Sequence, residues 1–339
     1  MAGRRAVTVA VVIALAAVVA AAAGTGLVRR YALAAELLDH PNARSSHEVP
    51  TPRGGGLAVV LTIMGGCAAG YVAGAVAQGW LATVILGGGL VAGIGFVDDH
   101  RDVPARWRLL VHLAACGIAT FALGPVATLP LPGGSVDLGV AGIGLSLLAG
   151  VSLVNLYNFM DGIDGLAGAE LVCVCGGLAV LGGPVLLLPS LLGVAAGLGF
   201  LVWNWPPARI FMGDVGSGFL GFLLGALLLA GLAVGETGVY GPLVLLGVFV
   251  VDATVTLFTR AFTGQRVGEP HRSHAYQILA RRFGHRAVTL AVCAVNAGWL
   301  LPLAWLAERF PPWGLPIMAL AWTPLVALAL AVGAGRATD

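Results

Sequence analysis

Long apolar runs separated by short polar gaps constrain this chain more than any other feature. A helix crosses the hydrocarbon core of a bilayer with about 20 apolar residues. About eleven runs approach that length, near residues 6–28, 55–77, 80–97, 109–125, 140–157, 165–183, 184–203, 216–235, 238–258, 287–306 and 314–334. The pattern predicts an all-α, polytopic integral membrane protein in which residues 1–339 form a single membrane-embedded domain.

The composition supports a membrane protein and excludes several other classes. Hydrophobic residues make up 58% of the 339 positions and charged residues only 10%, against about 25% charged residues in an ordinary soluble domain. The 51 glycines are typical of helices that pack closely in lipid. A net charge of +2 gives no sign of a nucleic-acid partner, and the absence of lysine excludes Schiff-base lysine chemistry.

The arginines predict how the chain is oriented in the membrane. Fifteen of the 18 arginines lie in alternate connections, which are residues 29–54, 98–108, 155–165, 204–215, 259–286 and the C-terminal tail. The other side keeps Arg4, Arg5 and Arg309, and all seven histidines accompany the arginine-rich side. The positive-inside rule therefore predicts that the rich side is cytoplasmic and that the N-terminus lies outside.

The first apolar run has two interpretations. Arg4 and Arg5 followed by an Ala/Val-rich stretch resemble a secretory signal. The run is long enough to span the bilayer, however, and exporting the segment after it would carry Arg29, Arg30 and Arg53 to the wrong side. We expect it to be retained as the first transmembrane helix.

The first polar gap, from Asp39 to Gly56, is basic and rich in glycine. Arg44, His47 and Arg53 bring cationic groups to the membrane surface. The three glycines at 54–56 allow backbone N–H groups to approach a phosphate where the next helix begins. The alternative is a basic loop that contacts anionic lipid headgroups.

The second gap begins with two adjacent carboxylates, Asp98 and Asp99, at the end of an apolar helix. Paired carboxylates at a membrane edge are costly unless they bind a cation or take part in acid–base chemistry. The alternative is that they are ordinary charges in a solvated loop, which also contains Arg101, Arg106 and Arg108.

The third gap places four oxygen-bearing side chains at intervals of three: Asn155, Asn158, Asp161 and Asp164. A helical continuation would stack them on nearly one face. Such a row suggests a hard cation such as Mg²⁺, or a ribose and base. The ligand order of an EF-hand loop is missing, and a polar turn between helices is the alternative.

The last two gaps add a carboxylate and a basic cluster. Asp214 precedes Gly216, Ser217 and Gly218 at the start of a helix, which predicts a metal site beside an anion-binding helix N-terminus. The basic cluster in the last gap consists of His271, Arg272 and His274. These side chains can donate hydrogen bonds to phosphate oxygens. The alternative is a solvated basic stretch. Carboxylates and cations together suit a metal-bridged diphosphate and phosphoryl transfer to a lipid.

The five gaps together resemble the polyprenyl-phosphate N-acetylhexosamine-1-phosphate transferases, the WecA/MraY-like superfamily of the glycosyltransferase family 4 type. The matching blocks are P-N-x-R-S-x-H with P-x-P-R-G-G-G, the Asp-Asp pair, N-x-x-N-F-M-D-G-I-D-G-L-A-G, F-M-G-D-x-G-S, and P-H-R-S-H-x-Y-Q. They follow one another from Asp39 to Gln277, over most of the chain. Eleven-helix members of the family, with cytoplasmic active sites, agree with the helices expected here.

The resemblance implies a substrate pair, a UDP-N-acetylhexosamine and undecaprenyl or another polyprenyl phosphate. The products would be UMP and a polyprenyl-diphosphate sugar, made in the bacterial cytoplasmic (inner) membrane as the first membrane step of a cell-surface glycan such as a cell-wall polymer or O-antigen. It also implies Mg²⁺ as cofactor, with Mn²⁺ as an alternative, and a homodimer is among the assemblies known for the family.

The resemblance also implies roles for individual residues. Asp98 and Asp99 match the catalytic pair, and Asp214 with Asn158 matches the metal ligands. The nucleotide and its uracil would be bound by Asp164, Asp161 and Asn155. Phosphate and sugar would be bound by Arg44, His47, Arg53, Arg108, His271, Arg272 and His274. Which Asp of the pair is the base, and whether displacement is single or double, stay open.

Some positions depart from the family pattern. The stretch PHRSHAYQ replaces a His-x-His-His form and is closer to the branch that uses 6-deoxy donors such as UDP-FucNAc or UDP-QuiNAc, with UDP-GlcNAc as the other donor expected. His112 stands where a Gln is expected, and Asp252 matches a family Asp to which we assign no role.

Two other functions fit the sequence less well than the transferase. A CDP-alcohol phosphatidyltransferase would need Ala-Arg after its Asp-Gly, which Asp161-Gly162 lacks. A transporter or a polyprenyl-lipid-binding protein is the remaining alternative, but transporters usually place ionisable residues near the bilayer midplane. Here the ionisable residues gather at one membrane edge.

Overall fold

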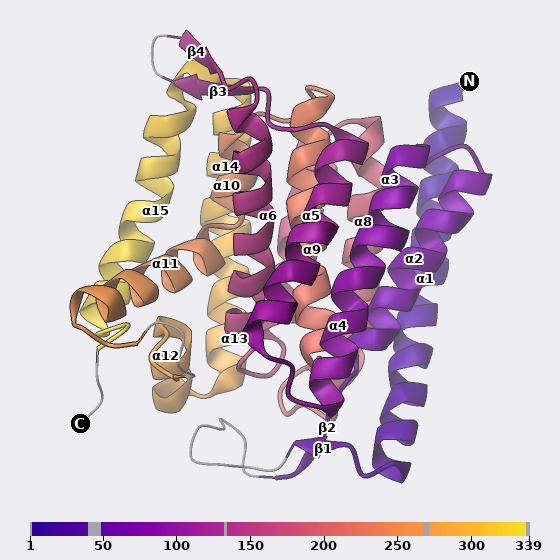
Figure 1. Ribbon diagram of the computed structural model, residues 1–339, viewed down its shortest axis with the longest axis vertical. Coiled ribbons are helices and arrows are strands. Elements are labelled where there is room, and N and C mark those ends of the chain that lie inside the picture. Colours follow the sequence, from indigo (N-terminus) through magenta and orange to yellow (C-terminus); the bar gives the residue numbers. More distant parts are fainter. Residues whose placement is uncertain (1, 40–48, 132–133, 267–270, 337–339) are drawn as a thin grey trace.

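The computed structural model describes residues 2–39, 49–131, 134–266 and 271–336 of the chain. Arg44 and His47, two of the expected phosphate-binding residues, lie outside these described residues. The described part is a bundle of helices with two short hairpins (Figure 1).

The longer helical segments form the body of the bundle. They are α1 (Ala2–Ala34), α3 (Gln78–Ala82) continued by the π-helical η1 (Thr83–Gly87) and α4 (Gly88–His100), α5 (Ala105–Leu123), α6 (Ala141–Met160), α8 (Pro184–Asn204), α9 (Asp214–Ala233), α13 (His285–Val295) continued by η2 (Asn296–Leu300) and α14 (Leu301–Arg309), and η3 (Pro311–Trp313) with α15 (Gly314–Ala331).

Shorter elements complete the fold. The shorter helices are α2 (Gly56–Val72), α7 (Leu166–Leu181), α10 (Tyr240–Leu245), α11 (Gly247–Phe262) and α12 (Ala275–Phe283). Two antiparallel hairpins are formed by β1 (Leu38–Asp39) with β2 (Thr51–Pro52), and by β3 (Thr128–Leu131) with β4 (Gly134–Asp137).

The helices confirm a multi-pass membrane protein. Eight helical segments in the described part are long and apolar enough to cross a bilayer, and the apolar helices α2 and α7 are shorter. The expected helix over 238–258 is interrupted, because α10 ends and α11 begins on either side of Leu246. Figure 1 shows α11 running obliquely across the bundle. The number of eleven spans stays a prediction.

The first helix packs as part of the bundle. α1 lies along α8 and α2, and the indole Nε1 of Trp203 on α8 donates a hydrogen bond of 2.8 Å to the carbonyl of Ala22. The backbones approach so closely that a Cβ added at Gly199 would lie 2.6 Å from the carbonyl oxygen of Val18. α1 is therefore packed as one of the helices of the bundle, and its retention stays a prediction.

Among the eight helical segments long enough to cross a bilayer, α9 is the most buried, and it contacts α2, α4, α5, α6 and α8. Most of its side chains are buried. Gly221 allows α6 to approach, since a Cβ there would lie 2.4 Å from the carbonyl oxygen of Leu153. The N-terminus of α9 is therefore surrounded by the ends of several helices, and this arrangement positions the candidate site.

The two ends of the bundle differ. The β3–β4 hairpin and the start of α1 lie at one end in Figure 1, while β1–β2, α12 and the end of α15 lie at the other. The ends of α4 and α6 and the start of α9 meet at the latter end, where Asp98, Asn158 and Asp214 come into contact.

Candidate active site

Arg108 joins two carboxylates that are far apart in the sequence. Its guanidinium Nη1 on α5 lies 2.5 Å from Asp98 Oδ2 at the end of α4 and 3.6 Å from Asp214 Oδ2 at the start of α9. Asn158 Nδ2 on α6 donates to Asp214 Oδ1 at 3.1 Å. Four helix ends thus bring together one cation, two carboxylates and one amide.

These residues line a small cavity of about 60 Å³, which has room for only a few water-sized groups. Its polar lining residues are Asp98, Arg108, His112, Asn155, Asn158 and Asp214. The cavity suits an ion and phosphate oxygens rather than a whole nucleotide. The structure therefore gathers five of the residues expected from the sequence, and it adds His112.

Asp98 and Asp99 have different environments although they are adjacent. Asp98 accepts from the backbone N–H of Val103 at 2.7 Å and faces the cavity. Asp99 is 7% exposed and accepts from the backbone N–H groups of Asp214 at 3.0 Å and Val215 at 3.1 Å. The carboxylate of Asp99 thus caps the N-terminus of α9.

The expected anion site at the start of α9 needs correction. The N–H groups of Gly216 and Ser217 donate to the carbonyl of Gly213, and the first two amides donate to Asp99. The anion at this helix terminus is therefore the protein's own carboxylate. Gly213 has φ +76°, and a Cβ there would lie 2.7 Å from Asp99 Oδ2, so glycine is required.

Gly55 and Gly56 do not offer their amides to a phosphate as expected. Gly55 N–H donates to the carbonyl of Phe211 at 2.9 Å, and Gly56 N–H donates to that of Met212 at 2.8 Å. A Cβ at Gly56 would lie 2.3 Å from the Cα of Gly216. These glycines join α2 to α9.

Arg53 belongs to a separate small pocket on the Asp99 side. It lines this pocket together with Gly54, Asp99 and His100, and its backbone N–H donates to the carbonyl of Leu37 at 3.2 Å. Arg53 therefore does not line the cavity that holds Asp98 and Asp214.

The row of four polar residues in the third gap is divided by the end of α6. The helix ends at Met160, and Asp161 follows with non-helical ψ 51°. Asn155 and Asn158 line the cavity from the helix. Desolvation raises the pKa of the Asp161 carboxyl well above its usual range, and the nearby carboxylates, Asp214 first, raise it further. The region therefore carries an excess of negative charge that favours a cation.

Asp164, expected to contact the nucleotide, holds two segments together. Its Oδ2 accepts from the backbone N–H of Ala208 at 3.0 Å, and its Oδ1 lies 3.3 Å from His285 Nδ1 on α13. Its backbone carbonyl accepts from the Thr289 hydroxyl at 3.0 Å. Sequence reasoning did not single out His285, whose only signal is a histidine at a helix start.

Asn204 was also missed. This buried side chain accepts from the backbone N–H of Gly165 at 2.9 Å and donates to the carbonyl of Ile210 at 2.9 Å. It ties the turn after α6 to the segment that leads to Asp214. A lone amide at the end of an apolar helix, before Pro206 and Pro207, was the available signal.

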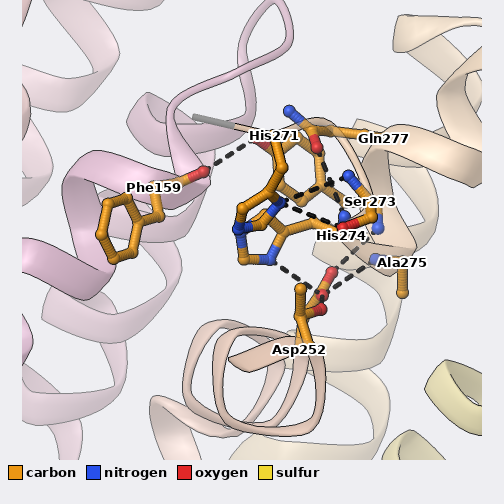
Figure 2. A network of polar contacts seen from close by, with 9 residues as sticks. Phe159, Asp252, His271, Ser273, His274, Ala275 and Gln277 are labelled. Atoms are coloured by element: carbon orange, nitrogen blue, oxygen red, sulfur yellow. Dashed lines mark hydrogen bonds and ion pairs between the residues drawn. The ribbon is translucent and has the colours of Figure 1, made fainter. Parts of the chain in front are cut away.

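The fifth gap forms a cluster beside the cavity (Figure 2). The His274 ring stacks on that of His271 at 5.0 Å between centroids, and lies 6.5 Å from the ring of Phe159. Tyr276 Oη donates to the carbonyl of Phe159 at 2.9 Å, and Phe159 lines the cavity. Arg272 is exposed. The cluster is thus connected to the cavity through Phe159.

His271 is neutral at pH 7. Burial lowers its pKa from 6.5 to about 4, and the neighbouring His274 and Arg260 act in the same direction against the opposing Asp252. His274 is 2% exposed. Of the three expected phosphate-binding residues in this gap, only Arg272 therefore presents an exposed positive charge.

Comparison with known proteins identifies a family to which the chain is similar. The family model for glycosyl transferase family 4 matches residues 80–232, a range that contains Asp98, Asn158 and Asp214. Asp252, His271 and His274 lie beyond the matched range.

Relatives match over a larger share of the chain. A Bacillus subtilis (strain 168) protein, named "Probable undecaprenyl-phosphate N-acetylglucosaminyl 1-phosphate transferase", is 31% identical over 281 residues, covering 80% of this chain and 78% of that protein. A Mycobacterium tuberculosis (strain ATCC 25618 / H37Rv) protein, named "Decaprenyl-phosphate N-acetylglucosaminephosphotransferase", is 31% identical over 303 residues, covering 79% and 75%. The chain therefore belongs to the WecA/MraY-like polyprenyl-phosphate sugar-1-phosphate transferases of glycosyl transferase family 4.

Proposed function

We propose that this protein transfers a sugar-1-phosphate from a UDP-N-acetylhexosamine to a polyprenyl phosphate such as undecaprenyl phosphate. The products are UMP and a polyprenyl-diphosphate sugar. The observation that carries the proposal is the cation bridge of Arg108 between Asp98 and Asp214 in a cavity at the helix ends. The relatives, whose names give undecaprenyl- or decaprenyl-phosphate as the lipid, support the same reaction class.

The proposed transfer forms one phosphoanhydride bond for each one that it breaks. An oxygen of the lipid phosphate attacks the phosphorus that carries the sugar, and the bond from that phosphorus to the bridging oxygen breaks, so UMP leaves with the bond electrons. The bond between sugar and oxygen stays intact, so the anomeric configuration is retained. Because one anhydride replaces another, the reaction is readily reversible.

Asp98 and Arg108 supply orientation and charge. The second pKa of a phosphate monoester is about 6, so the lipid phosphate is largely dianionic at pH 7 and little proton removal is needed. Arg108 can attract this dianion, and Asp98, fixed by Val103 N–H and Arg108, can accept a residual proton or orient the attacking oxygen. Asp99 positions Asp214 through the α9 amides.

The oxygen donors around Asp214 fit Mg²⁺. Within the described residues, no three His, Cys, Asp or Glu side chains are grouped to hold a metal ion by themselves. Mg²⁺ in phosphoryl-transfer enzymes is commonly held by one or two carboxylates and substrate phosphates. Asp214 and Asn158 would hold it here, with Mn²⁺ as the alternative ion. When bound, Mg²⁺ neutralises negative charge on the diphosphate.

The donor is an N-acetylhexosamine, and UDP-GlcNAc is the first candidate because both relatives' names contain N-acetylglucosamine. The sequence PHRSHAYQ favours the 6-deoxy donors UDP-FucNAc and UDP-QuiNAc as alternatives. We place the protein in the bacterial cytoplasmic membrane with the active site facing the cytoplasm, at the first membrane step of a cell-wall or O-antigen glycan. A homodimer would be compatible with this role.

The reaction is tested by UMP release from detergent-purified protein with undecaprenyl phosphate and Mg²⁺. UDP-GlcNAc, UDP-GalNAc, UDP-FucNAc and UDP-QuiNAc are compared, and EDTA is the control. EDTA-sensitive release with one donor supports the proposal. Failure of every donor with folded protein contradicts it.

Two variants of Arg108 test its bridge between Asp98 and Asp214. A single nitrogen of Arg108 contacts both carboxylates, so Arg108→Lys should keep activity within about tenfold of wild type. Arg108→Met keeps much of the side-chain volume without the charge and should lose about 100-fold or more in kcat/KM. Equal activity in the two variants would remove Arg108 from the site.

A further inference from the structure

A row of polar side chains on α11 faces the segment that contains His271 and His274. Asp252, Thr256 and Arg260 are spaced by four residues and are buried, so they share one face of the helix. Figure 2 shows Asp252 directed toward the start of α12. The catalytic proposal above assigns no task to these three residues.

The Asp252 carboxylate accepts from three neighbours on the segment that leads into α12. Its Oδ1 accepts from Ala275 N–H at 2.9 Å and lies 3.3 Å from His274 Nδ1, while its Oδ2 accepts from Tyr276 N–H at 2.8 Å. Thr256 Oγ1 also donates to Oδ1, at 3.1 Å. Asp252 is 6% exposed. It satisfies the first amides of α12 and fixes the helix start.

The same carboxylate fixes the His274 ring. Because Oδ1 accepts from Nδ1, the hydrogen of a neutral imidazole resides on Nδ1. The His271 ring stacks on His274, and His271 Nδ1 lies 3.1 Å from the Ser273 hydroxyl. The placement of His271 therefore depends on the placement of His274, and through it on Asp252 (Figure 2).

A second anchor lies after α15. Gly335 N–H donates to the carbonyl of Ser273 at 2.8 Å, and the carbonyl of Gly335 accepts from Gln265 Nε2 at 2.9 Å. Arg260 on α11 in turn donates to Gln265 Oε1 at 2.9 Å. Gly335 has φ +78°, and a Cβ there would lie 2.5 Å from the Thr256 carbonyl oxygen. Only glycine fits this contact.

We propose that Asp252 and Gly335 are positioning residues that hold the segment His271–Tyr276 for binding the diphosphate of the nucleotide sugar. Asp252 fixes the segment at His274 and the start of α12, and Gly335 fixes it at Ser273. Arg272, which is exposed and directly precedes the anchored Ser273, is thereby presented to the diphosphate. The identity of this ligand rests on the proposed function, whereas the positioning itself does not.

Asp252→Asn tests the first anchor. The amide keeps the shape but turns an NH₂ group toward N–H donors and removes the charge. We expect the KM for the UDP-sugar to rise about tenfold or more, with the KM for polyprenyl phosphate within about twofold of wild type. Gly335→Ala should show the same selective change, since its Cβ would collide with the Thr256 carbonyl oxygen and shift the Gly335 N–H that holds Ser273.

Proteolysis gives a readout that is independent of activity. Trypsin cleavage after exposed Arg272, followed by mass spectrometry, should be faster in Asp252→Asn and Gly335→Ala because both variants release the segment. If the wild type transfers no sugar from any donor, the proposed function fails while this assay still tests the positioning. Cleavage at the wild-type rate in both variants would overturn the positioning.

Matched controls separate positioning from general stability. Glu236 accepts from the N–H groups of Gly183, Val185 and Leu186 at the start of α8. Glu236→Gln should lower Tm, with the KM for the UDP-sugar and cleavage after Arg272 unchanged.

Gly333 has φ +80°, and a Cβ there would make only ordinary contact, 3.5 Å from Arg336 Cδ. Gly333→Ala should share the backbone strain of Gly335→Ala without its KM change. The same KM in all four variants would overturn the proposal.

Discussion

At the scale of single residues, several carboxylates of this protein cap helices to which they do not belong. Asp99 caps α9 and Asp252 caps α12. Glu236 caps α8, and Glu308 accepts from Gly238 N–H just before α10. A helix leaves its first amides unsatisfied, and polar partners are scarce in a chain with 10% charged residues. An acidic residue near the site therefore need not take part in the chemistry.

This distinction predicts different consequences for the two adjacent aspartates. Asp99→Asn should lower the free energy of unfolding by about 1–3 kcal/mol, because one of two capping acceptors is lost. Asp98→Asn should lower Tm less, because the amide oxygen can still accept from Val103 N–H and the lost ion pair with partly exposed Arg108 is offset in part by removal of a negative charge close to Asp214. Thermal unfolding of both variants in detergent measures the difference.

Both variants should release UMP slowly, so activity alone does not separate the two residues. Asp98→Asn loses the orienting carboxylate, and Asp99→Asn displaces Asp214. A Tm for Asp99→Asn equal to that of Asp98→Asn would contradict the capping role.

His271 predicts a pH dependence of stability. Its pKa is lowered from 6.5 to about 4 in the folded protein, so the unfolded chain binds more protons between these values. The stability that His271 contributes is fully present above pH 6.5 and is lost as the pH falls toward 4. We expect Tm to fall between pH 7 and pH 5, and to fall less in His271→Gln. An identical fall in both proteins would argue against a buried, neutral His271.

At the scale of elements, the crossing of α2 and α9 sets the geometry of the site. Gly56 and Gly216 bring the two backbones into contact, and the α9 start that results presents Asp214 to Asp98 and Asn158. The helix that carries the candidate metal ligand is thus positioned by glycines for which the sequence suggested a phosphate-binding role.

Gly56→Ala should therefore destabilise the protein by about 1–3 kcal/mol or more, since its Cβ would lie 2.3 Å from the Gly216 backbone. Gly65→Ala on the same helix is the matched control. A Cβ there meets nothing within 4 Å, and alanine is the better helix former by about 1 kcal/mol. Unfolding midpoints of both variants are compared, and a Gly56→Ala protein as stable as Gly65→Ala would contradict the close crossing.

At the scale of the whole molecule, the chemistry is collected at one end of the bundle. The arginine-rich gaps predict that this end faces the cytoplasm. Alkaline phosphatase, which folds to an active enzyme only outside the cytoplasm, should be active when fused after Gly235 and inactive when fused after Gly264. The reverse pattern of activity would invert the orientation.

The sequence by itself indicated a helical, multi-pass membrane protein and most members of the candidate site. Apolar runs partition into lipid because of their local composition, so their positions can be predicted without knowledge of packing. The ordered polar blocks identified Asp98, Asn158 and Asp214, which the structure brings into contact through Arg108.

Only the tertiary structure decided which partner each polar group takes. It separated Asp98 from Asp99, ended α6 at Met160, divided the expected 238–258 helix at Leu246, and gave Asp252 a place at the start of α12. The roles of Asp99 and Asp252 depend on which helix terminus the packing brings within about 3 Å of each carboxylate. Such proximity arises between segments up to about 115 residues apart, where local sequence patterns carry no information.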